Sequence, residues 1–336
     1  MTGIDFLIIG AQKAGTTSLF EYVRKHPQIH MPAEKEVSFF GRNYDRGWDW
    51  YMATVSRGAP PDAICGEASI GYMSGTPFAD ITLNEQGHKP DTQMFNEPLE
   101  NIIPERIRMS LPDVRLICVL RDPVARAYSH HQMAVLDEAE SRTFDDAIND
   151  LLTTNALTNS RITPTNSNGY IVNGEYHRIL AGFLDVFPRE QLMVIFSNEL
   201  SANATSTLAR IFDFIGVSSD FVPDNLNARY RAAATKRIIP GFDLYDWQRS
   251  AAGFRPLRVL WHGLPKSLRV KVDRGYRVCG YRVRMWNAHR SNATRAVSDM
   301  SAETRAALIQ HFLPDSHALT RLLDLEIPWL ADWQDL

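Results

Sequence analysis

The first long apolar stretch of the chain runs into a glycine-bounded loop and reads FLIIGAQKAGTTS, at residues 6–18. The residues that follow place Leu19, Phe20 and Val23 at helical spacing. This pattern predicts a buried strand, a loop and the N-terminus of a helix. At such a junction the free N–H groups and the positive end of the helix dipole meet at one point, which binds anions. Lys13 adds a full positive charge, so we expect an anion site here.

The glycine spacing of this loop is that of a nucleotide-phosphate loop, but its lysine lies elsewhere. Gly10 and Gly15 keep the G-x-x-x-x-G spacing, after which the nucleoside-triphosphate pattern has Lys and then Ser or Thr. Here Thr16 and Thr17 follow, and the lysine of the loop is Lys13. The loop therefore suits a 5′-phosphoryl group that carries one further charged unit. The alternative is an ordinary turn between a strand and a helix.

A second strand-to-helix junction is predicted further along the chain. Residues 114–120 form the clearest buried strand, and Asp122 and Pro123 are good N-cap and first-turn residues for the helix after it. Arg121 stands at the mouth of this junction, and Ser129 follows on the helix. Ligands of open α/β sheets bind at such strand ends, and arginine is suited to phosphate. One ligand with two separate anionic groups would fill both junctions.

Candidate proton acceptors stand in two places. Glu36 lies between Lys35 and an apolar pair, and a partly desolvated carboxylate beside a cation is suited to act as a general base. The alternative for it is a surface ion pair. His130 and His131 follow the second junction, either as acid–base groups or as partly exposed residues of a helix.

Composition bounds the class of protein. With 336 residues, 44% hydrophobic and 22% charged, the chain can bury a full core. No apolar run has the length of a membrane span and no signal peptide is recognised, so we expect a cytoplasmic protein. Cys65, Cys118 and Cys279 have no metal-binding spacing.

The net charge of −3 hides a strongly basic region. Residues 229–295 contain sixteen Lys and Arg against three acidic residues. This excess indicates either an anionic partner or a solvated basic face. Within it, residues 255–290 are basic and interleaved with apolar residues. They suit peripheral contact with an anionic membrane or a glycolipid headgroup, or equally a basic helical subdomain on the sheet edge.

The remaining pattern predicts an α/β protein with a mainly parallel sheet flanked by helices. Further strands are expected over 63–67 and 191–196, and further helices over 104–111, 143–152, 170–187 and 204–215, with a helical pair over 302–325. A short helix over 43–51 is expected to wall a pocket or to pack in the core. Residues 74–103 are expected to form a lid or acceptor loop, and residues 153–169 a loop. We expect Trp329 and Trp333 to pack back on the core.

Three motifs together resemble those of sulfotransferases that use 3′-phosphoadenosine 5′-phosphosulfate (PAPS). Residues 13–18 resemble the loop that holds the 5′-phosphosulfate, residues 35–40 the catalytic segment, and residues 121–129 the 3′-phosphate motif. Residues 66–69 correspond to an acceptor-side segment. The chain is most similar to the heparan-sulfate-type group and its bacterial relatives.

The resemblance implies a role for each matching residue. The donor PAPS and its product PAP would be bound by Lys13, Ala14, Gly15, Thr16, Thr17, Ser18, Arg121 and Ser129, with Lys236 and Arg237 as candidates for closing the site. Glu36 would take the proton of an acceptor hydroxyl, with Lys13 and Lys35 as the other catalytic residues. The acceptor side would hold Glu67, Ser69, Tyr72 and His131. No metal is required, and no nucleic acid is expected as a partner.

The resemblance also implies the domain organisation. Residues 1–225 would form a P-loop-NTPase-like PAPS-binding core, and residues 226–336 a basic, mostly helical part packed on it. The chain departs from the animal enzymes at Ala68, where a lysine is common after the glutamate, and in lacking the cysteines of their closing loop. The stretch 76–98 looks inserted and would reshape the acceptor side.

Sulfuryl transfer to a hydroxyl of a carbohydrate, glycolipid or other metabolite is therefore the expected function. A nucleotide-dependent kinase is the rival enzyme, but it would need a lysine at position 16, which is a threonine, and magnesium ligands. A third possibility is a nucleotide-binding or membrane-docking protein without catalysis, for which Glu36 would be dispensable.

Overall fold

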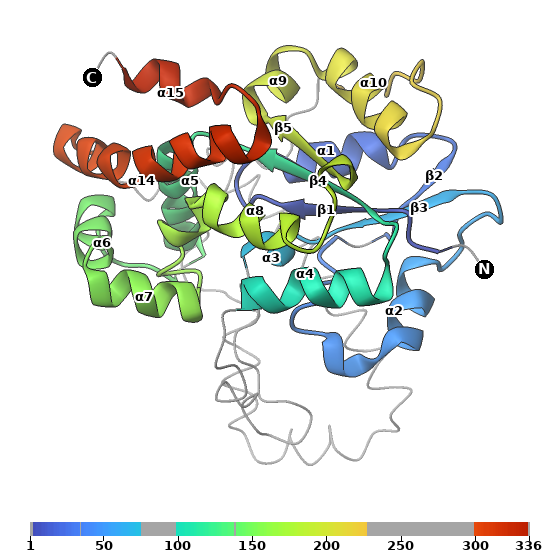
Figure 1. Ribbon diagram of the computed structural model, residues 1–336, viewed down its shortest axis with the longest axis horizontal. Coiled ribbons are helices and arrows are strands. Elements are labelled where there is room, and N and C mark those ends of the chain that lie inside the picture. Colours follow the sequence, from blue (N-terminus) through green and yellow to red (C-terminus); the bar gives the residue numbers. More distant parts are fainter. Residues whose placement is uncertain (1–2, 34, 75–98, 138, 227–298, 335–336) are drawn as a thin grey trace, which may run out of the picture. The chain divides into compact units, whose positions relative to one another are not determined.

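Five parallel strands form the centre of the fold, in the order β2-β3-β1-β4-β5. The computed structural model describes residues 3–33, 35–74, 99–137, 139–226 and 299–334. The strands are β1 (Phe6–Gly10), β2 (Ile29–His30), β3 (Ile64–Ala68), β4 (Arg115–Leu120) and β5 (Leu192–Phe196). Helices flank this sheet, so the expected α/β architecture is confirmed (Figure 1).

The helices follow the strands in an alternating order. The α-helices are α1 (Thr16–Val23), α2 (Trp48–Val55), α3 (Gly71–Ser74), α4 (Leu99–Ser110), α5 (Pro123–Leu136), α6 (Phe144–Leu151), α7 (Thr154–Ile162), α8 (Tyr176–Leu184), α9 (Ser197–Ala202), α10 (Ala204–Ile215), α14 (Ala302–Leu323) and α15 (Pro328–Trp333). Short 3₁₀ helices are η1 (Tyr44–Arg46), η3 (Val172–Gly174) and η4 (Arg189–Gln191). Helices α3, α4 and α8 pack together, and α9 and α10 pack with β5 (Figure 1).

The central strands are buried because their sequences are continuous apolar runs. All five residues of β1 are buried, as are five of the six in β4. Gly66 in β3 lies opposite Phe6 of β1, and a Cβ on Gly66 would lie 2.2 Å from the Phe6 ring. Glycine is therefore required for β3 to pair with β1.

The parallel pairing brings three loops to one edge of the sheet. Leu7 of β1 lies opposite Glu67 of β3, and Gly10 at the end of β1 lies opposite Cys118 of β4. Because the carboxyl ends of parallel strands share an edge, the loops after β1, β3 and β4 meet there. These loops carry most of the residues that the sequence singled out.

Two of the expected local structures are wrong. Residues 153–169 were expected to form a loop, but α7 occupies Thr154–Ile162 because Ala156 and Leu157 pack against the core. Residues 170–187 were expected to be one helix, but a 3₁₀ turn over Val172–Gly174 precedes the shorter α8. Residues Asn173 and Gly174 are weak helix formers, and this turn is buried.

Other boundaries also moved. The helical pair expected over 302–325 is the single helix α14, which contains Pro314. Residues 99–103 of the expected loop belong to α4, and residues 75–98 lie outside the described part of the chain. The two-residue strand β2 was not predicted, because a pair of residues has no readable alternation.

The last two helices belong to the same compact unit as residues 1–230. Helix α14 packs on α5, α6 and α8. Trp329 and Trp333 are 3% and 6% exposed, so they pack on the core as expected. Residues 227–298 lie outside the described residues, and most of the basic region falls within them. The proposed domain boundary at 225 and the membrane contact of 255–290 stay predictions.

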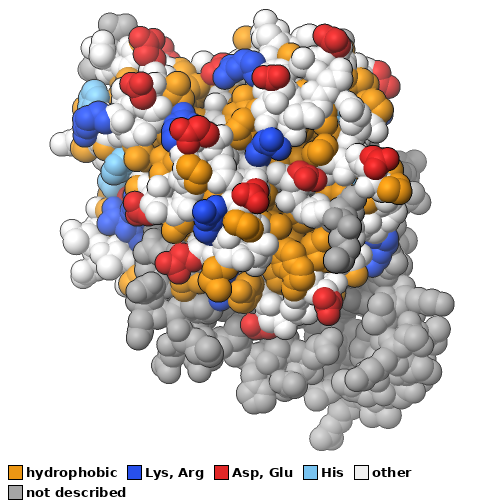
Figure 2. All heavy atoms as spheres, turned by 45° about the vertical axis from the view of Figure 1, so that its right-hand side comes forward, with side chains coloured by type: hydrophobic (Ala, Val, Ile, Leu, Met, Phe, Trp, Pro, Cys, Tyr) orange, Lys and Arg blue, Asp and Glu red, His pale blue; other side chains and the backbone are white. Residues whose placement is uncertain are grey.

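The described surface mixes charges of both signs. On the face in Figure 2, acidic and basic side chains are interspersed among polar and apolar ones. None of the described helices has the length and hydropathy needed to cross a bilayer. Of the three cysteines, Cys65 and Cys118 are described, and both are buried.

Candidate active site

The loop after β1 ends in an uncapped helix. Lys13 and Gly15 have φ angles of 67° and 109°, in the left-handed region, and α1 begins at Thr16. No side chain in the described part of the chain caps this helix, so its first N–H groups remain available to an anion. Thr16 is buried, while Thr17 and Ser18 are half-buried on the first turn. The strand, loop and helix follow one another as predicted, and the binding of an anion by this loop stays a prediction.

Arg121 joins the loops after β1 and β4. Its Nη1 donates to the backbone oxygen of Lys13 at 3.1 Å. The Tyr176 hydroxyl in turn donates to the backbone oxygen of Arg121 at 2.9 Å. The structure thus brings the two strand-to-helix junctions together, and Tyr176 supports the second one. Nothing in the sequence marked Tyr176, because it lies 55 residues beyond Arg121.

The second junction differs from the first in how it can hold an anion. Asp122 caps α5, and its Oδ1 accepts from the N–H groups of Val124 at 2.8 Å and Ala125 at 3.4 Å. Those two amides are therefore occupied by a carboxylate. The side chains left to hold an anion here are those of Arg121 and the half-buried Ser129 on α5, and their binding of a phosphate stays a prediction.

Glu36 and the anion loop are connected through Lys35. The Lys35 Nζ donates to Thr16 Oγ1 at 3.0 Å and lies 3.0 Å from Glu36 Oε1. The other carboxylate oxygen, Oε2, accepts from the backbone N–H of Ile70 at 3.0 Å. The Glu36 side chain remains 28% exposed. Lys35 therefore links the partly exposed Glu36 carboxylate to Thr16 at the start of α1.

The backbone around Glu36 is held in an uncommon conformation. Glu36 and Ser38 have φ angles of 68° and 52°, and residues with side chains rarely adopt such values. The Glu36 N–H donates to the Ala68 carbonyl at 2.9 Å. Conformations of this kind persist where the surroundings fix them, and they are common at active sites.

The predicted acceptor-side residues at the end of β3 lie inside the protein. Glu67, Ser69 and Tyr72 have no exposed surface. Glu67 accepts hydrogen bonds from the Ser69 hydroxyl at 2.8 Å and from the Tyr72 hydroxyl. Burial raises the pKa of Glu67 to about 7, although these two hydrogen bonds oppose the shift. Direct contact of these residues with an acceptor stays a prediction.

Both histidines of α5 are buried, which contradicts the expectation of partly exposed positions. Burial and the nearby charges of Arg126 and Lys13 hold the pKa of His130 well below its ordinary value, so its ring is neutral. The Nε2 of His131 bonds the Arg142 carbonyl at 3.1 Å, and the ring packs against Phe144. The amphipathic spacing of α5 gave no sign that α6 would cover this side.

Two buried polar residues lie within the predicted motifs, although the sequence assigned neither of them a role. Arg126 has no exposed surface and donates to the Tyr170 carbonyl, while its Nε and Nη1 have no partner among the described residues. The side-chain oxygen of Gln12 is likewise buried without a described partner. Gln12 belongs to the loop after β1 and Arg126 to the first turns of α5, and buried polar groups usually have a hydrogen-bond partner. Burial of a polar side chain has no sequence signal.

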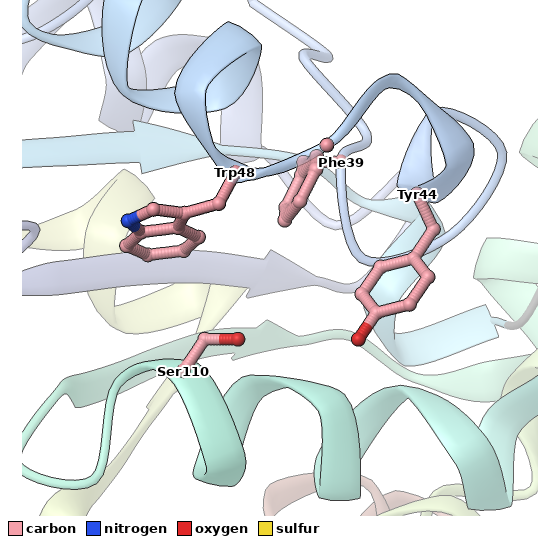
Figure 3. A pocket seen from close by; sticks show the side chains of 5 residues that line it. Phe39, Tyr44, Trp48 and Ser110 are labelled. Carbon is pink, nitrogen blue, oxygen red and sulfur yellow. The ribbon is translucent and has the colours of Figure 1, made fainter.

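The aromatic segment after the catalytic segment has two uses. Tyr51 is buried and stacks on Phe39, with ring centroids 4.5 Å apart. Tyr44 and Trp48 line an open hollow of about 500 Å³ together with Ser110 (Figure 3). Ser110 ends α4 and also lines a second pocket at the amino ends of β1 and β4. Phe39, three residues after Glu36, lines the same hollow, which therefore borders the segment that carries Glu36 (Figure 3).

Lys236 and Arg237, the candidates for closing the site, lie outside the described residues. Among the residues that are described, no group of three or more His, Cys, Asp or Glu is arranged to hold a metal ion.

Comparisons with known proteins agree with this geometry. The sulfotransferase domain family matches residues 4–236. The human heparan sulfate glucosamine 3-O-sulfotransferase 3B1 is 29% identical over 211 residues, which are 63% of this chain and 45% of that protein. The bovine bifunctional heparan sulfate N-deacetylase/N-sulfotransferase 2 is 29% identical over 222 residues, which are 63% of this chain and 22% of the relative. The chain thus spans less than half the length of these relatives.

A solved structure has a similar fold. The sulfotransferase from Alicyclobacillus acidocaldarius superposes with a TM-score of 0.61, at 22% identity and with 98% of both chains covered. This likeness concerns the fold, and the family match covers most of the chain, including the anion loop, Glu36 and Arg121. The chain belongs to the sulfotransferase domain family.

Proposed function

We propose that the protein transfers a sulfuryl group from PAPS to a hydroxyl group of a carbohydrate, glycolipid or other small metabolite. The observation that carries this proposal is the contact of Lys35 with both Thr16 and Glu36. It places a carboxylate base beside an anion loop whose helix amides are uncapped. The named relatives act on heparan sulfate, which favours a carbohydrate acceptor.

In the proposed reaction, the acceptor oxygen attacks the sulfur in line with the bond to the phosphate. Glu36 takes the proton of the hydroxyl, an oxygen–sulfur bond forms, and the bond from sulfur to the phosphate oxygen breaks. The negative charge that builds up on the departing phosphate would be neutralised by Lys13 and the amides of α1. Lys35, which hydrogen-bonds Thr16, would keep the Glu36 carboxylate at a fixed distance from the loop after β1.

The 3′-phosphate of the donor would bind at the second junction. Arg121 already contacts the Lys13 backbone, so one nucleotide can reach both loops. Ser129 on α5 offers a hydroxyl donor to the same phosphate. The orphaned nitrogens of Arg126 and the oxygen of Gln12 suit polar groups of a nucleotide. We propose that no metal takes part in this binding.

Calorimetry with PAP, ATP and GTP tests this proposal. We expect PAP to bind tightly without magnesium, because fixed cations and amides balance its charge. ATP is expected to bind more weakly whether or not magnesium is added. Preference for ATP with magnesium would contradict the proposal and favour a kinase. Incubation with labelled PAPS and a panel of carbohydrate acceptors would then identify the acceptor class.

A further inference from the structure

The Glu67 carboxylate is the centre of two parallel hydrogen-bond chains. Its Oε2 accepts from the Ser69 hydroxyl and its Oε1 from the Tyr72 hydroxyl. The Ser69 oxygen accepts from the backbone N–H of Ser38 at 2.8 Å. The Tyr72 oxygen accepts from the backbone N–H of Phe39 at 2.9 Å. Both chains thus run from the segment after Glu36 to one buried carboxylate.

The donor and the acceptor of each hydrogen bond in these chains follow from the protons available. A backbone N–H can only donate, so each hydroxyl oxygen must accept at that end. Each hydroxyl then has a single proton left, which it donates to Glu67. A carboxylate accepts one such bond on each oxygen, and it carries no proton that would itself need an acceptor. A carboxamide at position 67 would accept one bond and place N–H groups against the other hydroxyl.

The two amides that are held lie next to the strained part of the segment. Ser38 itself has a φ of 52°, and Glu36, with a φ of 68°, is two residues before it. The Glu36 carboxylate is also bonded by the N–H of Ile70, between Ser69 and Tyr72. The same short stretch of chain therefore holds the backbone after Glu36 and one oxygen of its side chain.

We propose that Glu67 is a positioning residue which, through Ser69 and Tyr72, fixes the left-handed turn that presents the Glu36 carboxylate to the acceptor hydroxyl. This inference rests on the proposed sulfuryl transfer for its catalytic meaning, but the fixed turn itself does not. This positioning role requires no contact with the acceptor, so it is compatible with the complete burial of Glu67, Ser69 and Tyr72.

An ionised carboxylate lowers the stability of the fold when it is buried. A residue that served only for packing would not need this charge. Burial raises the pKa of Glu67 to about 7, and the charged groups that face it are Glu36, Lys35 and the phenols Tyr51 and Tyr72. Because the folded pKa is raised from 4.5, the burial of Glu67 lowers the stability of the fold as pH rises from the unfolded pKa towards about 7, and the full loss is present at any higher pH. A neutral isostere should therefore fold at least as well at pH 8.

The test is Glu67→Gln, which keeps the volume and leaves one of the two chains. We expect kcat to fall by about 10–100-fold, since misplacement of a catalytic group has costs of this order. PAP affinity and thermal stability at pH 8 should be unchanged or slightly raised. Hydrogen exchange of the Ser38 and Phe39 amides should become about tenfold faster, with the β1 amides unchanged.

Two further variants make the result decisive. Tyr72→Phe removes one chain without a change in buried charge, and it should accelerate exchange at Phe39 more than at Ser38. Glu140→Gln is the matched control, because Glu140 is also buried but pairs with Arg142 on the α5–α6 side. We expect Glu140→Gln to lower stability and to leave kcat and both amides unaffected.

The outcomes separate this inference from the proposed function. Unchanged kcat and unchanged exchange at Ser38 and Phe39 in Glu67→Gln would overturn the positioning role. A wild-type protein that transfers no sulfuryl group to any acceptor would overturn the proposed function, while the exchange data would still decide whether Glu67 holds the turn.

Discussion

The Glu36 carboxylate has two kinds of partner, and these predict the effect of replacing it by glutamine. One carboxylate oxygen pairs with Lys35, and the other accepts from a backbone N–H. Glu36→Gln keeps an acceptor for the N–H and leaves the anion loop intact, but a carboxamide takes up no proton. We expect transfer to fall by about 10²–10⁴-fold, with PAP affinity nearly unchanged.

Rates with labelled PAPS and calorimetry with PAP measure the two effects. Glu21→Gln is the control, because the Glu21 side chain on α1 is 29% exposed, close to the value for Glu36, and forms an ion pair only with Arg24 among the described residues. If Glu36→Gln remained active, the base would lie elsewhere, and His130 or His131 would be the next residues to replace.

At the scale of secondary-structure elements, β4 carries one arginine at each end. Arg115 begins the strand and donates to the Ile215 carbonyl, while Arg121 follows its last residue and contacts the Lys13 carbonyl. Because α5 is capped by Asp122, the predicted 3′-phosphate contact depends on Arg121 rather than on helix amides. Loss of a hydrogen bond to a charged group has a cost of about 1.5–3 kcal/mol.

Arg121→Ala should therefore weaken PAP binding by about 10–100-fold. AMP, which lacks the 3′-phosphate, should lose much less affinity. Calorimetry with both ligands measures the ratio, and Arg115→Ala should leave both affinities unaltered. Equal losses for PAP and AMP would show that Arg121 acts only by supporting the loop after β1.

At the scale of the whole molecule, Glu175 links helices that are distant in sequence. It pairs with Arg161 of α7 at 2.7 Å, with Arg178 of α8, and with His311 of α14 at 3.0 Å. Burial alone would raise the pKa of Glu175, but hydrogen bonds from His311 and Arg161 outweigh it and lower the pKa. This network attaches the last long helix to the sheet domain.

Glu175→Gln should lower the free energy of unfolding by about 2 kcal/mol at pH 7, less than for a fully buried pair because Arg161 is 38% exposed. The folded pKa is lowered, so this stabilisation is present above the unfolded pKa and disappears as pH falls through the folded value. Urea unfolding of both proteins at pH 7 and at pH 3 measures it. A difference that persists at low pH would show that packing, not charge, is responsible.

The sequence alone determined the parts of this protein that depend on local patterns. Strands β1, β3, β4 and β5 were predicted to within two residues, and those of β1, β4 and β5 come from the continuous apolar runs that a buried strand requires. The loop after β1 and the cap at Asp122 were readable because glycine, aspartate and proline have strong local preferences. The family followed from the order and spacing of three such motifs.

Only the tertiary structure decided how those parts meet. The contacts of Arg121 with Lys13, of Lys35 with Thr16, and of Ser69 with Ser38 join segments that follow different strands. Burial of His130 and helix formation in α7 likewise depended on neighbours that pack from elsewhere in the chain. Local propensity amounts to tenths of a kcal/mol per residue, whereas burial of a side chain is worth about 1.5–3 kcal/mol, so long-range packing prevails wherever the two disagree.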